Sequence, residues 1–150
     1  MVNQVVRLSV INGMMISNLS IWLTLTLTSS NPLESHLWKQ RVVIVFSRNT
    51  QTLNDQLSHF YEAKDEFTDR DLVIYSLNIK QGTYPDQKSM SQEDYQWFVQ
   101  NYIQDKDDFL VVLIGKDGGT KFKSNITVAN SKLFDLIDSM PMRIQEMKGQ

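Results

Sequence analysis

The distribution of apolar and polar residues predicts a strand, a helix and a second strand in the first half of the chain. Residues 42–46 (VVIVF) are β-branched or aromatic throughout, which is typical of a strand covered by helices on both faces. Apolar residues then recur at helical spacing from 51 to 67, and residues 71–79 return to a strand pattern. A strand, a helix and a strand joined by a crossover of this length predict a right-handed parallel unit.

The pattern after residue 80 adds a loop and another helix. Residues 80–90 hold a glycine and a proline among polar residues and are expected to form a loop. Ser91, with Asp94 three residues later, is a helix-start signal. The helix that it predicts carries its apolar side chains on one face, which consists of Tyr95, Phe98, Val99, Tyr102 and Ile103.

A hairpin and a closing helix complete the pattern. Residues 109–114 are a second wholly apolar run, Asp117-Gly118-Gly119 predicts a tight turn, and residues 120–123 alternate as an edge strand should. Asn130 or Ser131 is the expected cap of the last helix. The resulting order, β-α-β-α-β-β-α, predicts a mixed sheet inside a three-layer α/β/α sandwich, which is the thioredoxin-like arrangement.

The last helix is interrupted by a proline. Pro141 cannot donate to the carbonyl four residues back, and it disfavours helix in the residue before it. The helix is therefore expected to kink or restart there. Arg143 lies just past this point, and we expect it to bond carbonyls freed by the kink, near Ile137 and Asp138, or to pair with Asp138 or Glu146.

Four segments carry a resemblance to one protein family. They are GKDGG (Gly115–Gly119), IDSMPMR (Ile137–Arg143), WKQR (Trp38–Arg41) and DRDLV (Asp69–Val73). Over residues 32–148 the sequence resembles the family called domain of unknown function 4174 (DUF4174). It implies a thioredoxin-like or peroxiredoxin-like fold and brings no established chemistry. Relatives occur in bacterial exported proteins and in animal extracellular-matrix proteins with sushi repeats, which implies an adhesive or partner-binding use of the fold.

The first thirty residues differ from the rest in composition. Arg7 is their only charged residue. One positive charge, an apolar stretch and the small residues Thr28 and Ser30 are typical of a secretory leader. Residues 1–31 are therefore expected to be a signal-like segment, and residues 32–150 a single thioredoxin-like domain. A chain of 150 residues has the usual size of one domain with its own core.

Two other interpretations of this segment stay open. Leucine and threonine alternate over residues 23–28, which is also the pattern of an amphipathic strand. A retained membrane span is disfavoured, because polar residues dilute a stretch that should be nearly all apolar. The leader predicts a periplasmic or extracellular protein whose mature domain has no stable membrane span.

Composition removes several classes of function. The net charge is −2 and the isoelectric point is near 5.6, so the chain lacks the basic surface that neutralises phosphates, and nucleic acid is not an expected partner. The sequence has no cysteine, which removes disulfides, thiolate zinc sites and thiol nucleophiles.

No metal and no cofactor are expected either. His36 and His59 are too few and too far apart in sequence to form a zinc site, and both are expected at the surface. Asp105, Asp107 and Asp108 lack the spacing of a calcium-binding loop, so a solvated turn is the better interpretation.

The turn after the first strand is where a thioredoxin-like fold places its reactive group, because the amides of the following helix stabilise a thiolate there. Here this turn is Ser47-Arg48-Asn49-Thr50-Gln51, without cysteine, so thiol redox chemistry is excluded. A serine is no nucleophile without a neighbouring base. Ser47, Arg48 and Asn49 are candidates for holding an anion at the helix N-terminus, and Arg143 is a fourth candidate for binding. The plainer interpretation of Arg48 is an exposed loop arginine.

The sequence therefore predicts a cysteine-free, non-redox domain that is exported and acts by binding an unknown protein or small-molecule partner. The alternative is an enzyme that grips an anionic small substrate at the Ser47–Gln51 turn. An enzyme should present convergent polar groups around that turn, whereas a binding module should present an apolar patch or a sheet edge.

Overall fold

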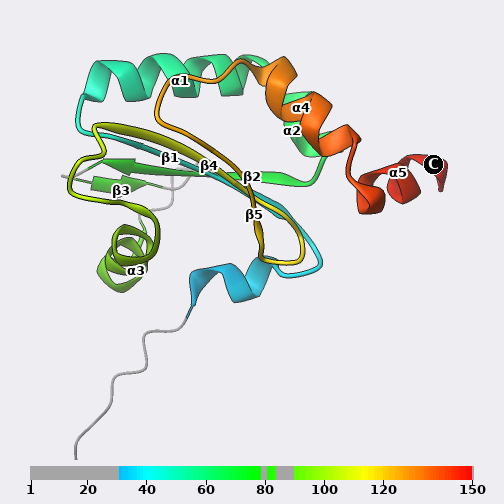
Figure 1. Ribbon diagram of the computed structural model, residues 1–150, viewed down its shortest axis with the longest axis horizontal. Helices are drawn as coiled ribbons and strands as arrows, with labels where there is room; N and C mark the ends of the chain where they lie inside the picture. Colours follow the sequence, from blue (N-terminus) through cyan, green and yellow to red (C-terminus); the bar gives the residue numbers. More distant parts are fainter. Residues whose placement is uncertain (1–30, 79–80, 84–89, 150) are drawn as a thin grey trace, which may run out of the picture.

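The computed structural model describes residues 31–78, 81–83 and 90–149, which form a mixed sheet with helices on both of its faces (Figure 1). The elements are the 3₁₀ helix η1 (Pro32–His36), β1 (Arg41–Ser47), α1 (Thr50–Glu62), α2 (Lys64–Asp69), β2 (Leu72–Asn78), β3 (Gln81–Thr83), α3 (Gln92–Tyr102), β4 (Phe109–Ile114), β5 (Thr120–Ser124), α4 (Asn130–Asp138) and α5 (Pro141–Lys148).

The sheet of the described residues has five strands in the order β3-β2-β1-β4-β5. The central strand β1 runs parallel to β2, with Arg41 opposite Leu72, and antiparallel to β4, with Val42 opposite Ile114. β4 and β5 form the antiparallel hairpin. At the hairpin turn Gly118 has a φ of +78°, a conformation that glycine adopts without steric cost. The predicted mixed sheet is confirmed.

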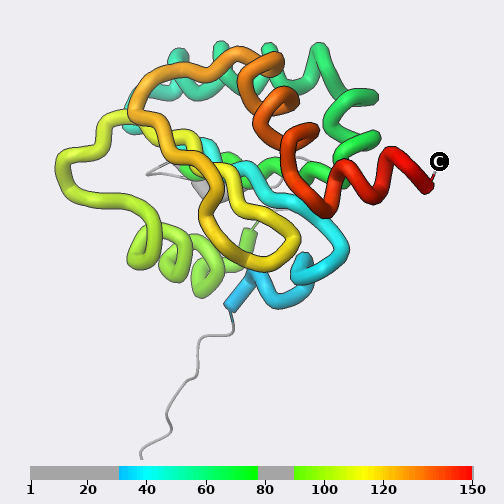
Figure 2. Tube along the Cα trace, turned by 45° about the vertical axis from the view of Figure 1, so that its right-hand side comes forward, coloured from blue at the N-terminus to red at the C-terminus, as the bar shows by residue number. Residues whose placement is uncertain are grey.

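Alternation along the strands separates two apolar cores. Val43 and Val45 of β1 point to the face covered by α1, α2 and α4, where they meet Phe60, Leu133 and Ile137. Val42, Ile44 and Phe46 point to the other face, where they meet Leu33 of η1, Tyr75 and Phe98 of α3. Figures 1 and 2 show α1 and α4 on one side of the sheet and α3 on the other. This is the three-layer α/β/α sandwich that the sequence predicts.

The prediction of one continuous helix over residues 51–67 is wrong, because the structure has two helices there. The chain leaves helical geometry at Ala63, where φ is −105° and ψ is 33°, and α2 follows as a separate short helix. The break brings the buried Phe67 ring to 5.1 Å from the buried Phe60 ring, measured between centroids. Core packing of these two rings therefore accompanies the break, which the helical spacing did not show.

Three smaller expectations are also corrected. The predicted loop 80–90 contains β3, which pairs with Ser76–Asn78 at the edge of the sheet. The cap of α4 is Ala129, and Asn130 instead donates to the carbonyl of His59 at 2.6 Å. His36 is buried rather than at the surface, since it lies 2.7 Å from the Tyr75 hydroxyl and fixes η1 against the sheet.

The proline restart is confirmed. α4 ends at Asp138, Met140 is extended with φ of −72° and ψ of 139°, and α5 begins at Pro141. This is the geometry that a proline imposes on the residue before it.

We expect a chain shortened to residues 31–150, which lacks residues 1–30, to fold by itself. Both cores are built from residues 33–137, and Asn31 already caps η1 by accepting the amide hydrogen of Leu33 at 3.0 Å. Urea unfolding of the shortened chain should give one cooperative transition. A gradual, non-cooperative loss of structure would mean that the alternating segment 23–28 belongs to the sheet. Residues 1–30 lie outside the described part of the chain.

Candidate functional site

The turn between β1 and α1 is closed by its own hydrogen bonds. The Ser47 hydroxyl is buried, donates to the carbonyl of Asn49 at 2.8 Å and accepts the amide hydrogen of Asn49 at 3.0 Å. The Asn49 side chain caps α1 by accepting the amide hydrogens of Gln51 at 2.8 Å and Thr52 at 3.2 Å. The donors that would hold an anion at this helix N-terminus are thus already used by Asn49.

The Arg48 side chain is hydrogen-bonded to a neighbouring loop rather than free in solvent. Its Nε donates to the carbonyl of Asp107 and its Nη2 to the carbonyl of Asp105, both at 2.9 Å. Its backbone amide donates to the carbonyl of Asp108 at 2.9 Å. Arg48 therefore ties the β1–α1 turn to the loop before β4. The Asp107 carboxylate is buried in that loop and accepts the amide hydrogen of Gln104, so the loop is less solvated than the sequence suggested.

At the opposite end of β1, two buried cations share one carboxylate of α5. Glu146 accepts from Arg41 Nη1 and Nη2 at 3.1 and 3.2 Å, and its Oε1 also accepts from Lys116 Nζ at 2.7 Å. Lys116 donates in addition to Asp71 at 2.8 Å. Arg41 is 1% exposed and Lys116 8%, so both charges depend on these partners for the solvation that they lose.

Arg143 continues this network, three residues before Glu146 in α5 and 3.8 Å from its carboxylate. Its guanidinium donates to the Asp69 carboxylate, to the Asp69 carbonyl at 2.8 Å and to Asp138 at 3.3 Å. Asp138 is also held by Arg70, through bonds of 3.0 and 2.6 Å. The expected pairing of Arg143 with Asp138 is confirmed. The carbonyl that it bonds belongs to Asp69, rather than to the residues next to the proline.

Two sets of ion pairs, joined by a contact of 3.8 Å between Arg143 and Glu146, form one group of eight charged residues, which we call the charge cluster: Arg41, Asp69, Arg70, Asp71, Lys116, Asp138, Arg143 and Glu146. It holds four positive and four negative side chains. Seven of them fall in the four motif segments, and Glu146 follows three residues after the last. The motifs thus meet at one place in the fold, where the start of β1, the start of β2, the end of β4 and α5 come together.

The backbone beside the cluster has two non-glycine residues with positive φ. Asp71 has a φ of 51° and Trp38 of 63°. The carbonyl of Asp71 accepts from the amide of Arg41 at 2.8 Å, and the amide of Trp38 donates to the carbonyl of Lys116 at 2.7 Å. Left-handed backbone costs energy in residues with a side chain, so the surrounding bonds hold these two in place.

The cluster shifts the ionisation of its carboxylates. Burial, the largest influence on Glu146, opposes its charge, but hydrogen bonds from Lys116 and Arg41 outweigh it and lower the pKa of Glu146. Burial likewise opposes the charge of Asp138, and the bonds from Arg70 and Arg143 bring its pKa below the ordinary value. Both groups are therefore carboxylates at neutral pH.

The structure separates the four candidate residues. Ser47, Arg48 and Asn49 lie where β1 meets α1, whereas Arg143 lies in α5 at the far end of the sheet (Figure 1). The main residues that sequence reasoning missed are Arg41, Lys116 and Glu146. A signal for the first two was present, because a charged residue directly before or two residues after a fully apolar strand lies close to the core and needs a partner.

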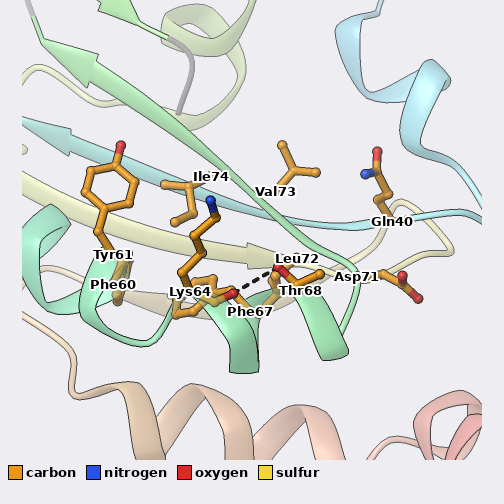
Figure 3. A pocket seen from close by; sticks show the side chains of 10 residues that line it. All are labelled: Gln40, Phe60, Tyr61, Lys64, Phe67, Thr68, Asp71, Leu72, Val73 and Ile74. Carbon is orange, nitrogen blue, oxygen red and sulfur yellow. Dashed lines mark hydrogen bonds between the residues drawn. The ribbon is translucent and has the colours of Figure 1, made fainter. Parts of the chain in front are cut away.

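One hollow lies between the α1–α2 break and β2, with a volume of about 470 Å³ (Figure 3). Its polar side chains do not converge. Figure 3 shows Gln40 and Asp71 at one end and Lys64 beside Ile74, and the Thr68 hydroxyl donates to the carbonyl of Lys64 at 2.9 Å. A ligand site normally brings a few polar groups to one point, so this hollow is a weak candidate.

A second hollow adjoins the charge cluster, and we call it the motif pocket. Its volume is about 380 Å³, and it is lined by Arg41, Gly115, Lys116, Asp117, Lys121, Met140, Pro141 and Met142. It lies between the β4–β5 turn and the start of α5. In the described part of the chain, no group of three or more histidine, cysteine or acidic side chains has a metal-binding arrangement, and no helix is long and apolar enough to cross a membrane.

Comparisons with known proteins agree with this fold. A family model described as "Domain of unknown function (DUF4174)" matches residues 32–146. The chain is similar to the crystal structure of reduced 2-Cys peroxiredoxin from Plasmodium vivax, with 15% identity and a TM-score of 0.53 over 79% of this chain and 85% of that one. It is also similar to the mitochondrial 2-Cys peroxiredoxin from Plasmodium falciparum, with 13% identity and a TM-score of 0.53 over 79% and 84%. No curated protein matched this chain.

We expect Arg143→Ala to lower the free energy of unfolding by about 2–4 kcal/mol, because Asp69 loses its closest cation and its carbonyl loses a donor, while Asp138 keeps only Arg70. Arg48→Ala is the matched control. Its side chain is 40% exposed and loses two carbonyl bonds and an ion pair of 3.6 Å with the exposed Asp108, which contributes little, so the cost should be about 1 kcal/mol or less. Urea unfolding of both variants measures the difference. Equal stability of Arg143→Ala and the parent chain would show that this part of the cluster does not hold the fold together.

Acid should weaken the fold through Glu146. The pKa of Glu146 is lower in the folded than in the unfolded chain. Its contribution to the free energy of unfolding is therefore complete above the unfolded pKa of about 4.3 and is lost as the pH falls through the folded pKa. Glu146→Gln should therefore be less stable than the parent chain at neutral pH by about 1–3 kcal/mol. The difference in free energy of unfolding between the variant and the parent chain should become smaller below about pH 4. Unfolding curves at several pH values test this, and a gap that is independent of pH would contradict it.

Proposed function

Because this chain belongs to the DUF4174 family and carries no cysteine on a fold shared with peroxiredoxins, we propose that it is an exported, non-redox domain that acts by binding. The thioredoxin-like fold is a scaffold whose function depends on the groups placed upon it, so the fold by itself assigns no activity.

The single observation that carries the proposal is the self-sufficient turn at Ser47–Gln51. In a redox protein of this fold, a thiolate takes up the hydrogen bonds of this helix N-terminus. Here the Asn49 side chain accepts the amide hydrogens of Gln51 and Thr52, and the Ser47 hydroxyl is hydrogen-bonded to the backbone of Asn49. Among the residues that the structure describes, no base lies beside the Ser47 hydroxyl, and the side-chain cap of α1 is already in use, which favours a role other than catalysis at this end.

The alternative, an enzyme that holds an anionic substrate at this turn, has less support. It would need Arg48 as the anion-binding cation, yet Nε and Nη2 of Arg48 are already bonded to the carbonyls of Asp107 and Asp105. It would also need Asn49 to give up the cap of α1, at a cost of about 1 kcal/mol.

Export is supported by sequence composition alone. Arg7 precedes a long stretch without charge, and the composition changes at Asn31-Pro32, where the described fold begins. A cysteine-free domain needs no particular redox compartment for folding, so secretion is compatible with this chain without being required by it.

The absence of redox activity can be measured directly. We expect the purified, metal-free full-length protein to consume hydrogen peroxide and to reduce insulin disulfides no faster than buffer. Thiol chemistry needs a thiolate, which this chain cannot supply. A cysteine-containing thioredoxin-fold protein serves as the positive control. Turnover above the buffer rate would overturn the non-redox proposal.

Export can be tested separately. Residues 1–31 fused to a reporter enzyme that is active only outside the cytoplasm should yield activity, and Leu25→Arg in the same fusion should abolish it, because a charge interrupts the apolar stretch. Activity that survives this substitution, or no activity in either fusion, would contradict the leader.

A further inference from the structure

We propose that the motif pocket binds a small organic anion with an apolar tail, of the type of a medium-chain carboxylate. The inference deepens the proposed binding function, on which it rests, by naming a site and a class of ligand. Three properties of the pocket carry it: unused donors on buried cations, an uncapped helix start, and an apolar wall.

The buried cations that line the pocket have donors to spare. An arginine has five N–H groups and a lysine three. Arg41 uses three of its five, on the Arg70 carbonyl and on Glu146, and Lys116 uses two of its three. Within the described residues, no acceptor takes the others. A carboxylate, which only accepts hydrogen bonds, matches a site of this kind.

The start of α5 opens on the same pocket. Met140 is its N-cap and gives no side-chain cap, and Pro141 at the first position has no N–H. Among the described residues, no acceptor takes the amide hydrogens of Met142 and Arg143. The charges of Arg41 and Lys116 are already balanced by Glu146 and Asp71, so their contribution is the donors that those carboxylates leave unused. These donors, the two amides and the positive end of the helix dipole together favour a negative group at this position.

The remainder of the lining suits an uncharged tail. Met140, Pro141 and Met142 form an apolar wall, and methionine side chains adapt to ligands of different shape. The single carboxylate in the lining belongs to Asp117, which is bonded to Lys121 at 2.6 Å and to the amide of Gly119 at 3.0 Å. It is therefore neutralised within the turn. The volume of about 380 Å³ lies within the usual range for small-molecule sites.

The test uses the full-length protein and four simple probes. Sodium octanoate should give saturable shifts of the amide signals of Gly115–Gly119 and Met142–Arg143 in a proton–nitrogen NMR titration. 1-Octanol lacks the anion, acetate lacks the tail and octylamine carries the opposite charge, so each should bind at least about tenfold more weakly. This is the order of effect expected when a charge-assisted hydrogen bond or a buried apolar chain is lost.

A matched pair of variants locates the site. Met142→Asp places a negative charge at the pocket while favouring the start of α5, so the fold should persist and octanoate binding should weaken about tenfold or more. Ile144→Asp introduces the same charge on the same helix outside the lining. The two residues are equally exposed, at 36% and 37%, and Ile144→Asp should leave binding nearly unchanged.

Several outcomes would overturn the inference: no saturable shift with octanoate, equal binding of 1-octanol, or equal weakening by Ile144→Asp. The result is also separable from the proposed function. Loss of the pocket inference leaves the non-redox proposal intact, whereas peroxide or disulfide turnover would overturn that proposal whatever octanoate does.

Discussion

The carboxylate of Glu146 is the group on which the end of the sheet beside α5 depends. Two cations, Arg41 and Lys116, lie almost entirely out of solvent at the ends of the two central strands, and both bond to it. A buried charge without a partner costs several kcal/mol. Lys116 also has Asp71, whereas Glu146 is the carboxylate that pairs with Arg41, so the burial of the start of β1 depends on the docking of α5. The helix contributes few apolar contacts, since its large side chains Met142, Ile144 and Met147 are exposed. Its position is therefore set by charge more than by packing.

The two ends of the sheet have different properties. Where the peroxiredoxin-like fold places a thiolate, this chain has a turn that satisfies its own hydrogen bonds through Ser47 and Asn49. At the other end, the motif segments build a network of ion pairs around a pocket. Among the described residues, the unused donors of buried cations therefore lie at the end of the sheet opposite to the one that carries the reactive group in redox proteins of this fold.

The sequence predicted the sheet and its helices well, because those elements depend on periodicity that is local in the chain. The run of residues 42–46, the glycines of the hairpin and Pro141 each imposed the structure expected from them. The break at Ala63 was missed, since it accompanies packing between Phe60 and Phe67 that spacing alone does not show. The charge cluster was missed for a related reason. Its partners are up to 105 residues apart, and no local pattern records which lysine meets which glutamate.

The position of α5 also affects the order in which the fold can form. It is the last of the described elements in the chain, yet it neutralises a residue at the start of the first strand. Contacts between such distant segments slow folding, because a long loop must close before they are gained. While the protein is being synthesised, β1, β2 and β4 are complete before Glu146, the carboxylate that both buried cations share, has been made. A ribosome-bound chain that lacks α5 would leave Lys116 with Asp71 alone and Arg41 without a carboxylate, with the end of the sheet open until the last helix emerges.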